Sequence, residues 1–393
     1  MRSFDIPEKY KSEKIAAIKA KRKADDPKKK DFTPSYVDFE KFELILARHF
    51  GFCFGVENAI ERAYKALAEN PGKRIFLLSQ MIHNPAVNKD LEENGIRFIM
   101  DTEGKQFIPW EEISKEDIVL IPAFGTTLEI EGILAKKGID AKTYDTTCPF
   151  VEKVWNRSAK LGKDQYTVII HGKPKHEETR ATFSHAAASG PALVVKDMGE
   201  AQLLGGLMLK NAEAEEYAKH FGERVNPGFS FEQDLNKVGV VNQTTMLASD
   251  TQAIADYFKT VMEEKFGTEN IKEHFADTRD TLCYATNDNQ NATLELLKEP
   301  ADLALVVGGY NSSNTSHIVE LCEQKFPTYF IKGPECLESI DIISHWNYPA
   351  KKNEISKEWY PKGNKKPRII ITSGASCPDS LLEAVLNRLI EIS

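Results

Sequence analysis

Residues 145–149 read DTTCP, a turn between an apolar, strand-like run and a helical pattern, and this setting occurs three times along the chain. The other two turns read GFCFG at residues 51–55 and TLCYA at residues 281–285. The three cysteines lie too far apart for a local metal knuckle, so we expect three loops from three similar units to converge on one centre. Three thiolates leave one position open, which suits an iron–sulfur cluster that must contact a substrate.

Composition restricts the classes of protein that this chain can belong to. Its 393 residues favour two to three domains, and 41% hydrophobic with 28% charged residues is typical of a folded protein. No apolar run approaches the roughly 20 residues that cross a bilayer, so we expect no membrane partner. The formal net charge of −8 argues against a nucleic-acid partner, although local helix N-termini can still bind a small anion.

Cysteine usage and the first forty residues bear on the compartment. Six cysteines, without a secretory signal peptide or disulfide-scaffold spacing, predict a reducing compartment and a cytoplasmic location. A plastid would apply in a photosynthetic eukaryote, but acidic residues break the pattern of a transit peptide. We expect residues 1–40 to form a charged, partly helical extension. The acidic residues are Asp5, Glu8, Glu13, Asp25 and Asp26.

From residue 41 onward, short apolar runs alternate with polar turns and amphipathic stretches. This alternation predicts parallel βαβ units and an α/β fold, whose ligands collect at the carboxyl ends of the strands. The expected strands are Phe42–Ala47, Arg74–Leu78, Asp117–Ile121, Thr167–Ile170, Lys237–Val241, Leu303–Val307 and Arg368–Thr372.

Dividing the chain near the three cysteines gives three α/β domains, which we expect to be related by pseudo-threefold symmetry around a central cluster. Their boundaries are 41–148, 149–280 and 281–393, after the extension of residues 1–40. The middle domain carries a charged stretch near 205–236, which predicts a solvated helix on the periphery. Residues 348–366 are rich in Lys, Pro and Gly, which predicts a surface loop.

Histidines and a glutamate follow two of the strands. His83 and His176 are interpreted as anion ligands whose imidazole N–H groups donate to phosphate oxygens. His171 is either a third such ligand or a strand-end residue. Glu178 is a candidate general acid if its surroundings are apolar enough to keep it protonated near neutrality, and otherwise a carboxylate favoured by the first turn of a helix.

Two polar loops open helices, NSSN at residues 311–314 and TSGASCP at residues 372–378. Hydroxyl groups and backbone N–H groups at a helix N-terminus form an anion site, and ordinary capping does not explain four consecutive polar residues. No Walker motif is present and no G-x-G-x-x-G motif follows a strand, which argues against a nucleotide ligand. Among the remaining cysteines, Cys322 is expected in the core, Cys336 lies in a loop, and Cys377 falls inside the second polar loop.

Together these motifs resemble the 4-hydroxy-3-methylbut-2-enyl diphosphate reductase family of the non-mevalonate isoprenoid pathway, in its plant and cyanobacterial branch. The similarity extends from about Leu46 to Ile392. The motifs that carry it, in chain order, are Gly51–Asn58, Ile82–Asn84, Asp145–Val151, His176–Thr182, Asn242–Thr245, Cys283–Gln290, Gly308–Asn314 and Thr372–Pro378.

The resemblance implies a [4Fe–4S] cluster held by Cys53, Cys148 and Cys283, with one iron not ligated by cysteine. It implies that Glu178 and Thr244 act in catalysis, Glu178 as the proton donor and Thr244 as the hydroxyl that orients the substrate. The reaction would use two electrons and two protons to give isopentenyl and dimethylallyl diphosphate, with ferredoxin or flavodoxin as the donor. The implied substrate-binding residues are His83, His176, Thr244, Ser312, Ser313, Asn314 and Ser376.

One departure from the family pattern affects the anion site. Many bacterial members have Ala-His-Gly where this chain has Ala123-Phe124-Gly125, so a diphosphate-binding histidine is missing. Thr126, Thr127 and His171 are the residues that could replace it. Two rival hypotheses remain at this point: a non-redox phosphosugar isomerase or binding module, and a structural zinc site built on the cysteines. Zinc normally requires four protein ligands, and the sequence shows no fourth.

Overall fold

The computed structural model describes residues 4–28, 30–278, 281–363 and 365–393. The chain forms two compact units, each assembled from separated segments. The first unit comprises Met1–Glu61, Ile82–Asp90 and Tyr284–Ser393, and the second comprises Arg62–Met81 and Leu91–Cys283. Within the described residues, no helix has the length and apolar character needed to span a membrane.

The first unit is built on a five-stranded sheet in the order β1-β2-β14-β10-β11. Strand β1 pairs antiparallel with β2, and the other pairs are parallel. All five residues of β10 are buried, as expected for a central strand covered on both faces. The strands are β1 (Ser35–Asp38), β2 (Glu43–Leu46), β10 (Leu303–Val307), β11 (Thr328–Ile331) and β14 (Arg368–Ser373).

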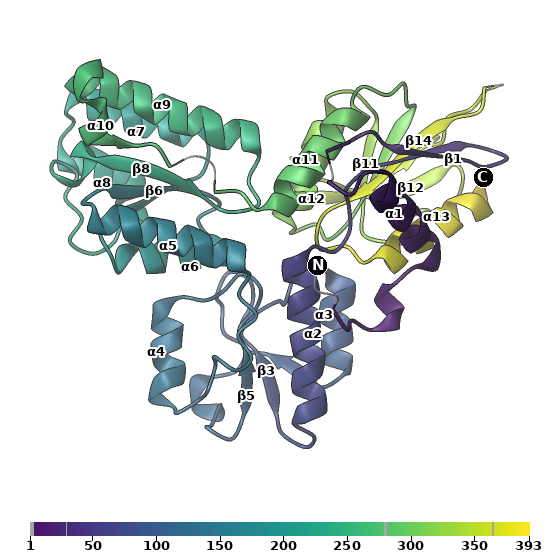
Figure 1. The fold of residues 1–393 in the computed structure, drawn as a ribbon, viewed down its shortest axis with the longest axis horizontal. Helices are drawn as coiled ribbons and strands as arrows, with labels where there is room; N and C mark the ends of the chain where they lie inside the picture. The colour runs from purple at the N-terminus through teal and green to yellow at the C-terminus, as the bar shows by residue number, and fades with distance from the viewer. Residues whose placement is uncertain (1–3, 29, 279–280, 364) are drawn as a thin grey trace. The chain divides into compact units, whose positions relative to one another are not determined.

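Helices and one hairpin complete the first unit (Figure 1). Helix α2 begins in this unit and ends in the second, as does α3. The helices are α1 (Glu13–Asp25), α2 (Phe54–Glu69), α3 (Pro85–Glu93), α11 (Tyr284–Leu296), α12 (Ser313–Glu323) and α13 (Asp379–Ile392), with 3-10 turns at Glu8–Tyr10 and Pro334–Cys336. The hairpin consists of β12 (Ile342–Asn347) and β13 (Lys352–Lys357).

The expected N-terminal extension is part of the folded first unit. Helix α1 packs against α13, and Lys19 forms an ion pair of 2.7 Å with Asp379 at the start of α13. Ile15 is 1% exposed and belongs to the same hydrophobic core as the central strands. The Ser12 side chain caps α1 by accepting a hydrogen bond of 3.0 Å from the Ile15 backbone N–H. The extension therefore contributes apolar burial as well as charge.

The second unit contains two parallel sheets. The smaller has the order β4-β3-β5, and the larger has the order β7-β6-β8-β9. The strands are β3 (Ile75–Leu77), β4 (Ile96–Phe98), β5 (Ile118–Leu120), β6 (Thr167–His171), β7 (Ala192–Val195), β8 (Val238–Asn242) and β9 (Phe275–Ala276). The helices are α4 (Leu128–Lys136), α5 (Pro149–Lys163), α6 (Glu177–Ala187), α7 (Met198–Lys210), α8 (Ala214–Phe221), α9 (Ala248–Phe266) and α10 (Ile271–His274), with short 3-10 turns between them.

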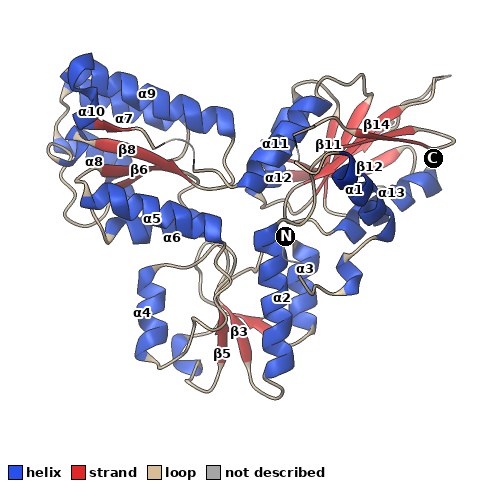
Figure 2. Ribbon diagram, viewed as in Figure 1, coloured by secondary structure: helices blue, strands red, loops and turns tan. Residues whose placement is uncertain are grey.

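Helices cover both faces of the larger sheet, as Figure 2 shows for α5 and α6 on one side and α7 and α9 on the other. Successive strand residues point to opposite faces, so Ile169 packs in the core of α7 and α9, whereas Val168 and Ile170 pack in the core of α5 and α6. Because both faces are buried, the strands are continuously apolar rather than alternating. The expected α/β class with short parallel sheets is confirmed.

All seven expected strands are found, but two expectations about larger segments differ from the structure. The stretch near 205–236 is not simply peripheral, because Leu207, Tyr217 and Phe221 are buried in the core. Residues 352–357 of the expected surface loop form strand β13. The charged composition of the first stretch did not report the core that buries these apolar side chains, and the composition of the second did not report the neighbouring strand β12 with which β13 pairs.

Candidate functional site

The three cysteine turns keep the setting that their sequence predicts. Cys148 is the N-cap residue of α5 with Pro149 in the first turn, and Cys53 and Cys283 directly precede α2 and α11. All three are partly exposed, whereas Cys322, Cys336 and Cys377 are buried. A helix N-terminus stabilises a thiolate, so the chemistry of these three positions fits a cluster ligand.

Backbone hydrogen bonds hold each cysteine turn in place. The Cys53 N–H donates to the Ala375 carbonyl (3.3 Å), and the Cys148 N–H donates to the Ala123 carbonyl (3.0 Å). Cys53 belongs to the first unit, and Cys148 and Cys283 belong to the second. Among the described residues, no three His, Cys, Asp or Glu side chains form a preformed metal-ion site, and the ligand set stays a prediction.

Burial raises the pKa of the Cys148 thiol to about 11, and the neighbouring negative charges of Cys283 and Glu178 add to the effect. The thiol is therefore neutral in the absence of a cation at this position. A coordinated metal reverses this preference, because it deprotonates the thiol that binds it. Since Cys283 and Glu178 both act on Cys148, these three side chains lie in one region of the second unit.

The first unit gathers most of the predicted anion-binding residues. Ser312 caps α12, and its Oγ accepts a hydrogen bond of 3.3 Å from the Thr315 N–H. The Ser376 hydroxyl donates to the His83 carbonyl (3.1 Å) and lies 3.5 Å from the Ser312 Oγ. Ser313 is buried in the first turn of the same helix. Two loops and the residues before α3 thus meet at the N-terminus of α12, where backbone N–H groups favour an anion.

Asn314 has the clearest signature of a ligand-binding side chain in this group. Its Oδ1 accepts hydrogen bonds from the Asn289 Nδ2 (3.2 Å) and from the Ala375 N–H (2.9 Å). These two donors fix the amide orientation. Its Nδ2 is buried and has no hydrogen-bond acceptor among the described residues. An orphaned buried donor is costly unless a ligand accepts from it, which fits a phosphate oxygen.

Glycines allow the backbones around this group to approach closely. A Cβ atom at Gly309 would collide with the His83 carbonyl, and one at Gly374 would collide with the Thr315 hydroxyl. These collisions involve the backbone or a buried side chain, so larger residues would push the loops apart. The glycines therefore keep the His83 segment and the second polar loop against the start of α12.

In the second unit, Glu178 lies in the first turn of α6 and is 1% exposed. Its Oε1 accepts a hydrogen bond of 2.5 Å from the Thr244 N–H, and the Thr244 carbonyl accepts from the Cys283 N–H (3.2 Å). Burial raises the pKa of Glu178 to about 7, against the opposing effect of the hydrogen bonds from Thr244. The carboxyl is thus partly protonated near neutrality, as general-acid catalysis requires.

His176 caps α6, and its ring orientation follows from that role. Its Nδ1 accepts a hydrogen bond of 3.2 Å from the Glu178 N–H, so the neutral ring carries its proton on Nε2. Phe124, at the position of the missing histidine, packs edge-on against this ring with a centroid separation of 5.5 Å. Phe124 therefore offers no hydrogen bond to an anion, and instead makes an aromatic contact with His176, which is itself a predicted anion ligand.

The residues considered as replacements for the missing histidine have other contacts. Thr127 caps α4, where its hydroxyl accepts a hydrogen bond of 3.4 Å from the Ile130 N–H. His171 is buried at the end of β6, with its Nδ1 3.1 Å from the Thr251 hydroxyl. The Thr126 carbonyl lies 3.2 Å from the His185 Nε2. For His171, these surroundings favour the strand-end interpretation.

Sequence reasoning did not single out Asn289, although it positions Asn314. The available signal was the polar run Asn287-Asp288-Asn289-Gln290 inside a helix whose Asn289 and Gln290 are buried.

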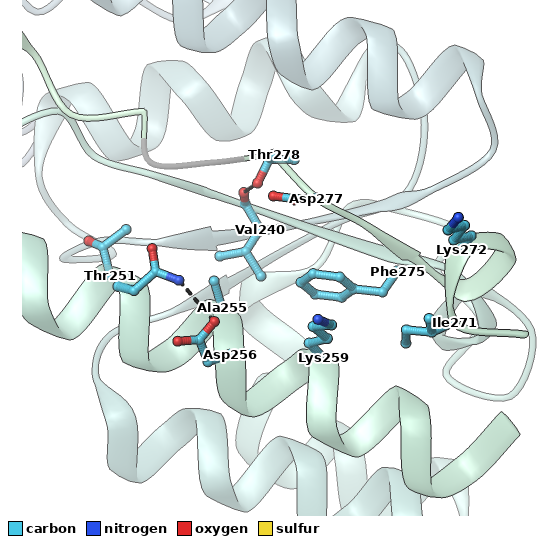
Figure 3. Close-up of a pocket in the computed structure, with 11 residues that line it drawn as sticks. Val240, Thr251, Ala255, Asp256, Lys259, Ile271, Lys272, Phe275, Asp277 and Thr278 are labelled. Atoms are coloured by element: carbon cyan, nitrogen blue, oxygen red, sulfur yellow. Dashed lines mark hydrogen bonds between the residues drawn. The ribbon is translucent and has the colours of Figure 1, made fainter. Parts of the chain in front are cut away.

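A separate cavity of about 430 Å³ lies in the second unit between α9 and residues 271–278, and contains none of the predicted site residues (Figure 3). Its lining includes the exposed ends of Asp256, Lys259 and Lys272.

Comparisons with known proteins identify the family of the chain. Residues 44–390 match the family model described as LytB protein. The chain is 40% identical to a 4-hydroxy-3-methylbut-2-enyl diphosphate reductase of Synechococcus sp. (strain WH7803), covering 90% of this chain and 86% of that protein. It is 39% identical to the reductase of the same name from Gloeobacter violaceus, covering 88% and 82%.

Two solved structures are similar to the chain. One is titled as (E)-4-hydroxy-3-methyl-but-2-enyl diphosphate reductase, the terminal enzyme of the non-mevalonate pathway. It has a TM-score of 0.54 and 26% identity, and the match covers 89% of this chain and 99% of that one. The other, a reductase from Plasmodium falciparum, has a TM-score of 0.61 and 23% identity, covers 88% and 86%, and supports the fold.

Proposed function

The chain belongs to the LytB protein family and is an enzyme that reduces 4-hydroxy-3-methylbut-2-enyl diphosphate in the terminal step of the non-mevalonate isoprenoid pathway, and we propose how its residues divide this reaction. The phosphosugar and structural-zinc hypotheses do not agree with this membership. The observation that carries the proposal is the pair of hydrogen bonds that Thr244 makes. Its N–H donates to the buried Glu178 carboxyl, and its carbonyl accepts from the Cys283 N–H.

We propose that Cys53, Cys148 and Cys283 hold a [4Fe–4S] cluster through their thiolates. Support comes from the shared position of the three cysteines at helix N-termini and from their partial exposure, in contrast to the buried Cys322 and Cys336. When bound, the cluster supplies electrons and an iron without a cysteine ligand for the substrate hydroxyl. The protein's own residues hold the substrate and deliver protons.

The reaction breaks the C–O bond of the allylic hydroxyl and forms a C–H bond. Two electrons and two protons are consumed, one proton leaving with the oxygen as water and the other bonding to carbon. We assign the first proton to the Glu178 carboxyl and the orientation of the substrate to the Thr244 hydroxyl. Protonation at either end of the allyl system would give isopentenyl or dimethylallyl diphosphate.

The diphosphate is assigned to His83, Ser312, Ser313, Asn314 and Ser376 of the first unit, together with His176 of the second. The buried Asn314 Nδ2 without an acceptor supports the first group, and the Nε2–H tautomer supports His176 as a donor. Neutral donors and a helix N-terminus favour an anion without requiring a cluster of lysines.

We assign the electron supply to ferredoxin or flavodoxin, because the sequence has no nucleotide or flavin motif that would accept electrons from a two-electron carrier. Six cysteines without the spacing of a disulfide scaffold suit a reducing compartment, and we assign the cytoplasm. A direct test of the donor is anaerobic turnover with reduced ferredoxin compared with NADPH alone. Turnover with NADPH alone at the same rate would contradict this assignment.

The ligand assignment is tested by single serine substitutions followed by iron and sulfide analysis of anaerobically reconstituted protein. Cys53→Ser, Cys148→Ser and Cys283→Ser are each expected to lose most of the cluster and its brown colour. Cys336→Ser is the matched control, because that thiol is buried away from the helix N-termini and should leave cluster content unchanged. Full cluster content in Cys148→Ser would remove it from the ligand set.

A further inference from the structure

A second cavity in the second unit lies apart from the residues assigned to the reaction. Its volume is about 660 Å³, within the range of sites for drug-sized ligands. Helices α4 and α6 form part of its wall, and the rest comes from β7 and from the segments after β4, β6 and α8. None of the predicted cluster, substrate or proton-donating residues lines it.

Two guanidinium groups line the cavity, those of Arg180 and Arg224, and among the described residues the Arg180 group has no carboxylate partner. Among the described residues, the Arg180 guanidinium makes one hydrogen bond, of 3.3 Å from its Nη2 to the Thr102 carbonyl, and its buried Nε has no acceptor. Neighbouring cations are neutralised within the described part of the chain, Lys175 by Glu103 and Arg224 by Glu200. An unpaired, partly buried cation is costly, and an anion that enters the cavity would relieve that cost.

The protein holds this guanidinium against a specific turn. Gly104 adopts a left-handed conformation with φ of +91°, and a Cβ atom there would collide with the Arg180 Nη1. The Asp101 carboxylate braces the same turn by accepting from the Glu103 and Lys105 N–H groups, at 2.9 and 2.8 Å. The guanidinium therefore lies directly against this turn, at a place that only a residue without a Cβ atom leaves open.

The rest of the lining is mainly apolar and selects the kind of anion. Aromatic and aliphatic side chains face the cavity from several elements, including Trp110, Ile130, Ile133 and Phe183. Two exposed carboxylates, Glu129 and Glu223, also border it and would repel a multiply charged ligand. Because Arg224 is paired with Glu200, Arg180 is the cation of the lining that is left for a ligand, and beside the apolar side chains it matches a molecule with a single negative group on a hydrocarbon or aromatic body.

Helical geometry separates this cavity from the proton donor on the same helix. Arg180, Phe183, Ser184 and Ala187 follow the spacing i, i+3, i+4 and i+7, which places them on one face of α6. Glu178 precedes Arg180 by two positions, about 200° around the helix axis. We propose that this cavity is a binding site for a monoanionic organic molecule, with Arg180 as its charge-recognising residue.

The test uses isothermal titration calorimetry of the anaerobic, cluster-loaded protein with 8-anilinonaphthalene-1-sulfonate, a monoanion with an aromatic body. Its uncharged relative N-phenyl-1-naphthylamine is the matched probe. Each titration is run without and with saturating inorganic diphosphate, which fills the substrate's anion site. We expect one saturable site for the sulfonate in the wild type. Loss of all sulfonate binding on adding diphosphate would place the probe in the substrate site and overturn the proposal.

Variants separate the charge from the apolar wall. Arg180→Met should weaken sulfonate binding about 10- to 100-fold, the loss of one or two charge-assisted hydrogen bonds, with little change for the uncharged probe. Phe183→Ala should weaken both probes, and Arg180→Lys should retain part of the sulfonate affinity. Lys160→Met, which removes an exposed positive charge from α5, is the control and should change neither. Equal sulfonate affinity in Arg180→Met and the wild type would overturn the proposal.

Discussion

At the scale of single residues, burial decides which polar groups are suited to chemistry. Glu178 and Glu177 are neighbours in the first turn of α6, and both are buried. The Glu177 carboxylate accepts a hydrogen bond from the Ser79 hydroxyl, whereas desolvation raises the pKa of Glu178 to about 7. Adjacent carboxyl groups with the same sequence signature thus serve different purposes, because their surroundings differ.

Glu178→Gln should lower anaerobic turnover by about 10²- to 10⁴-fold, since glutamine keeps the shape and cannot supply a proton. Cluster content and substrate affinity should change little. Glu177→Gln is the control, with its effect expected on stability rather than on the proton transfer. Turnover measured with an artificial one-electron donor tests this expectation, and near wild-type activity in Glu178→Gln would exclude it as the donor.

The raised pKa of Glu178 also predicts a pH dependence. The protonated carboxyl is the active form, so turnover of the wild type should fall as pH rises through about 7. The pKa of Glu178 is about 7 in the folded state, above its ordinary value of 4.5. Its contribution to the free energy of unfolding is therefore fully present below pH 4.5 and is lost as the pH rises through about 7. Urea unfolding of wild type and Glu178→Gln between pH 4.5 and 8 measures the second effect. A difference between them that does not vary with pH would contradict it.

Asn314→Ala should weaken substrate affinity about 10- to 100-fold, because it removes a buried amide donor that would otherwise bond to a phosphate oxygen. Calorimetric titration with the diphosphate substrate measures the change, and iron analysis checks that the cluster is retained. Asn289→Ala should give a smaller loss of affinity, because it leaves the donor but frees the amide to rotate. Wild-type affinity in Asn314→Ala would remove this residue from the anion site.

At the scale of elements, the first forty residues show how a polar segment joins a core. Helix α1 has a mostly charged sequence, and among its residues Ile15 is the buried one. That side chain packs with the central sheet, while Lys14 and Lys19 bond to Asn387 and Asp379 of α13. One apolar anchor and a few polar contacts are enough, because the sheet already provides the apolar surface.

Ile15→Ala should destabilise the first unit by about 2–5 kcal/mol through loss of apolar burial and creation of a cavity. Lys21→Ala, on the exposed surface of the same helix, should change stability by less than about 0.5 kcal/mol. The midpoint of urea unfolding, followed by circular dichroism, compares the two variants. An equally small effect of Ile15→Ala would mean that α1 does not depend on this core contact.

At the scale of the whole molecule, the first unit is discontinuous in sequence. Strand β2, near the N-terminus, pairs with β14, near the C-terminus, and β14 pairs in turn with β10. The sheet can therefore form only after the last strand is available. The second unit, by contrast, draws both of its sheets from the part of the chain between residues 62 and 283.

Deleting residues 368–393 should unfold the first unit and spare the second. The deletion removes β14 from between β2 and β10, together with the helix against which α1 packs. Hydrogen exchange with mass spectrometry should show loss of protection in β2 and β10 and retained protection in β6 and β8. Retained protection in β2 would show that its pairing with β14 is not essential. Loss in all four strands would show that the two units do not fold independently.

The sequence by itself determined the α/β class, the positions of seven strands, the three cysteine turns and the family. These properties depend on local patterns, such as apolar runs, turn residues and the order of motifs, which can be read directly from the sequence. Tertiary structure alone decided that β2 joins the β14 sheet, that Asn289 holds the Asn314 amide, and that Glu178 is buried enough to raise its pKa to about 7. Periodicity reports that a face is buried, but strand pairing, amide orientation and desolvation depend on which distant residues bury it.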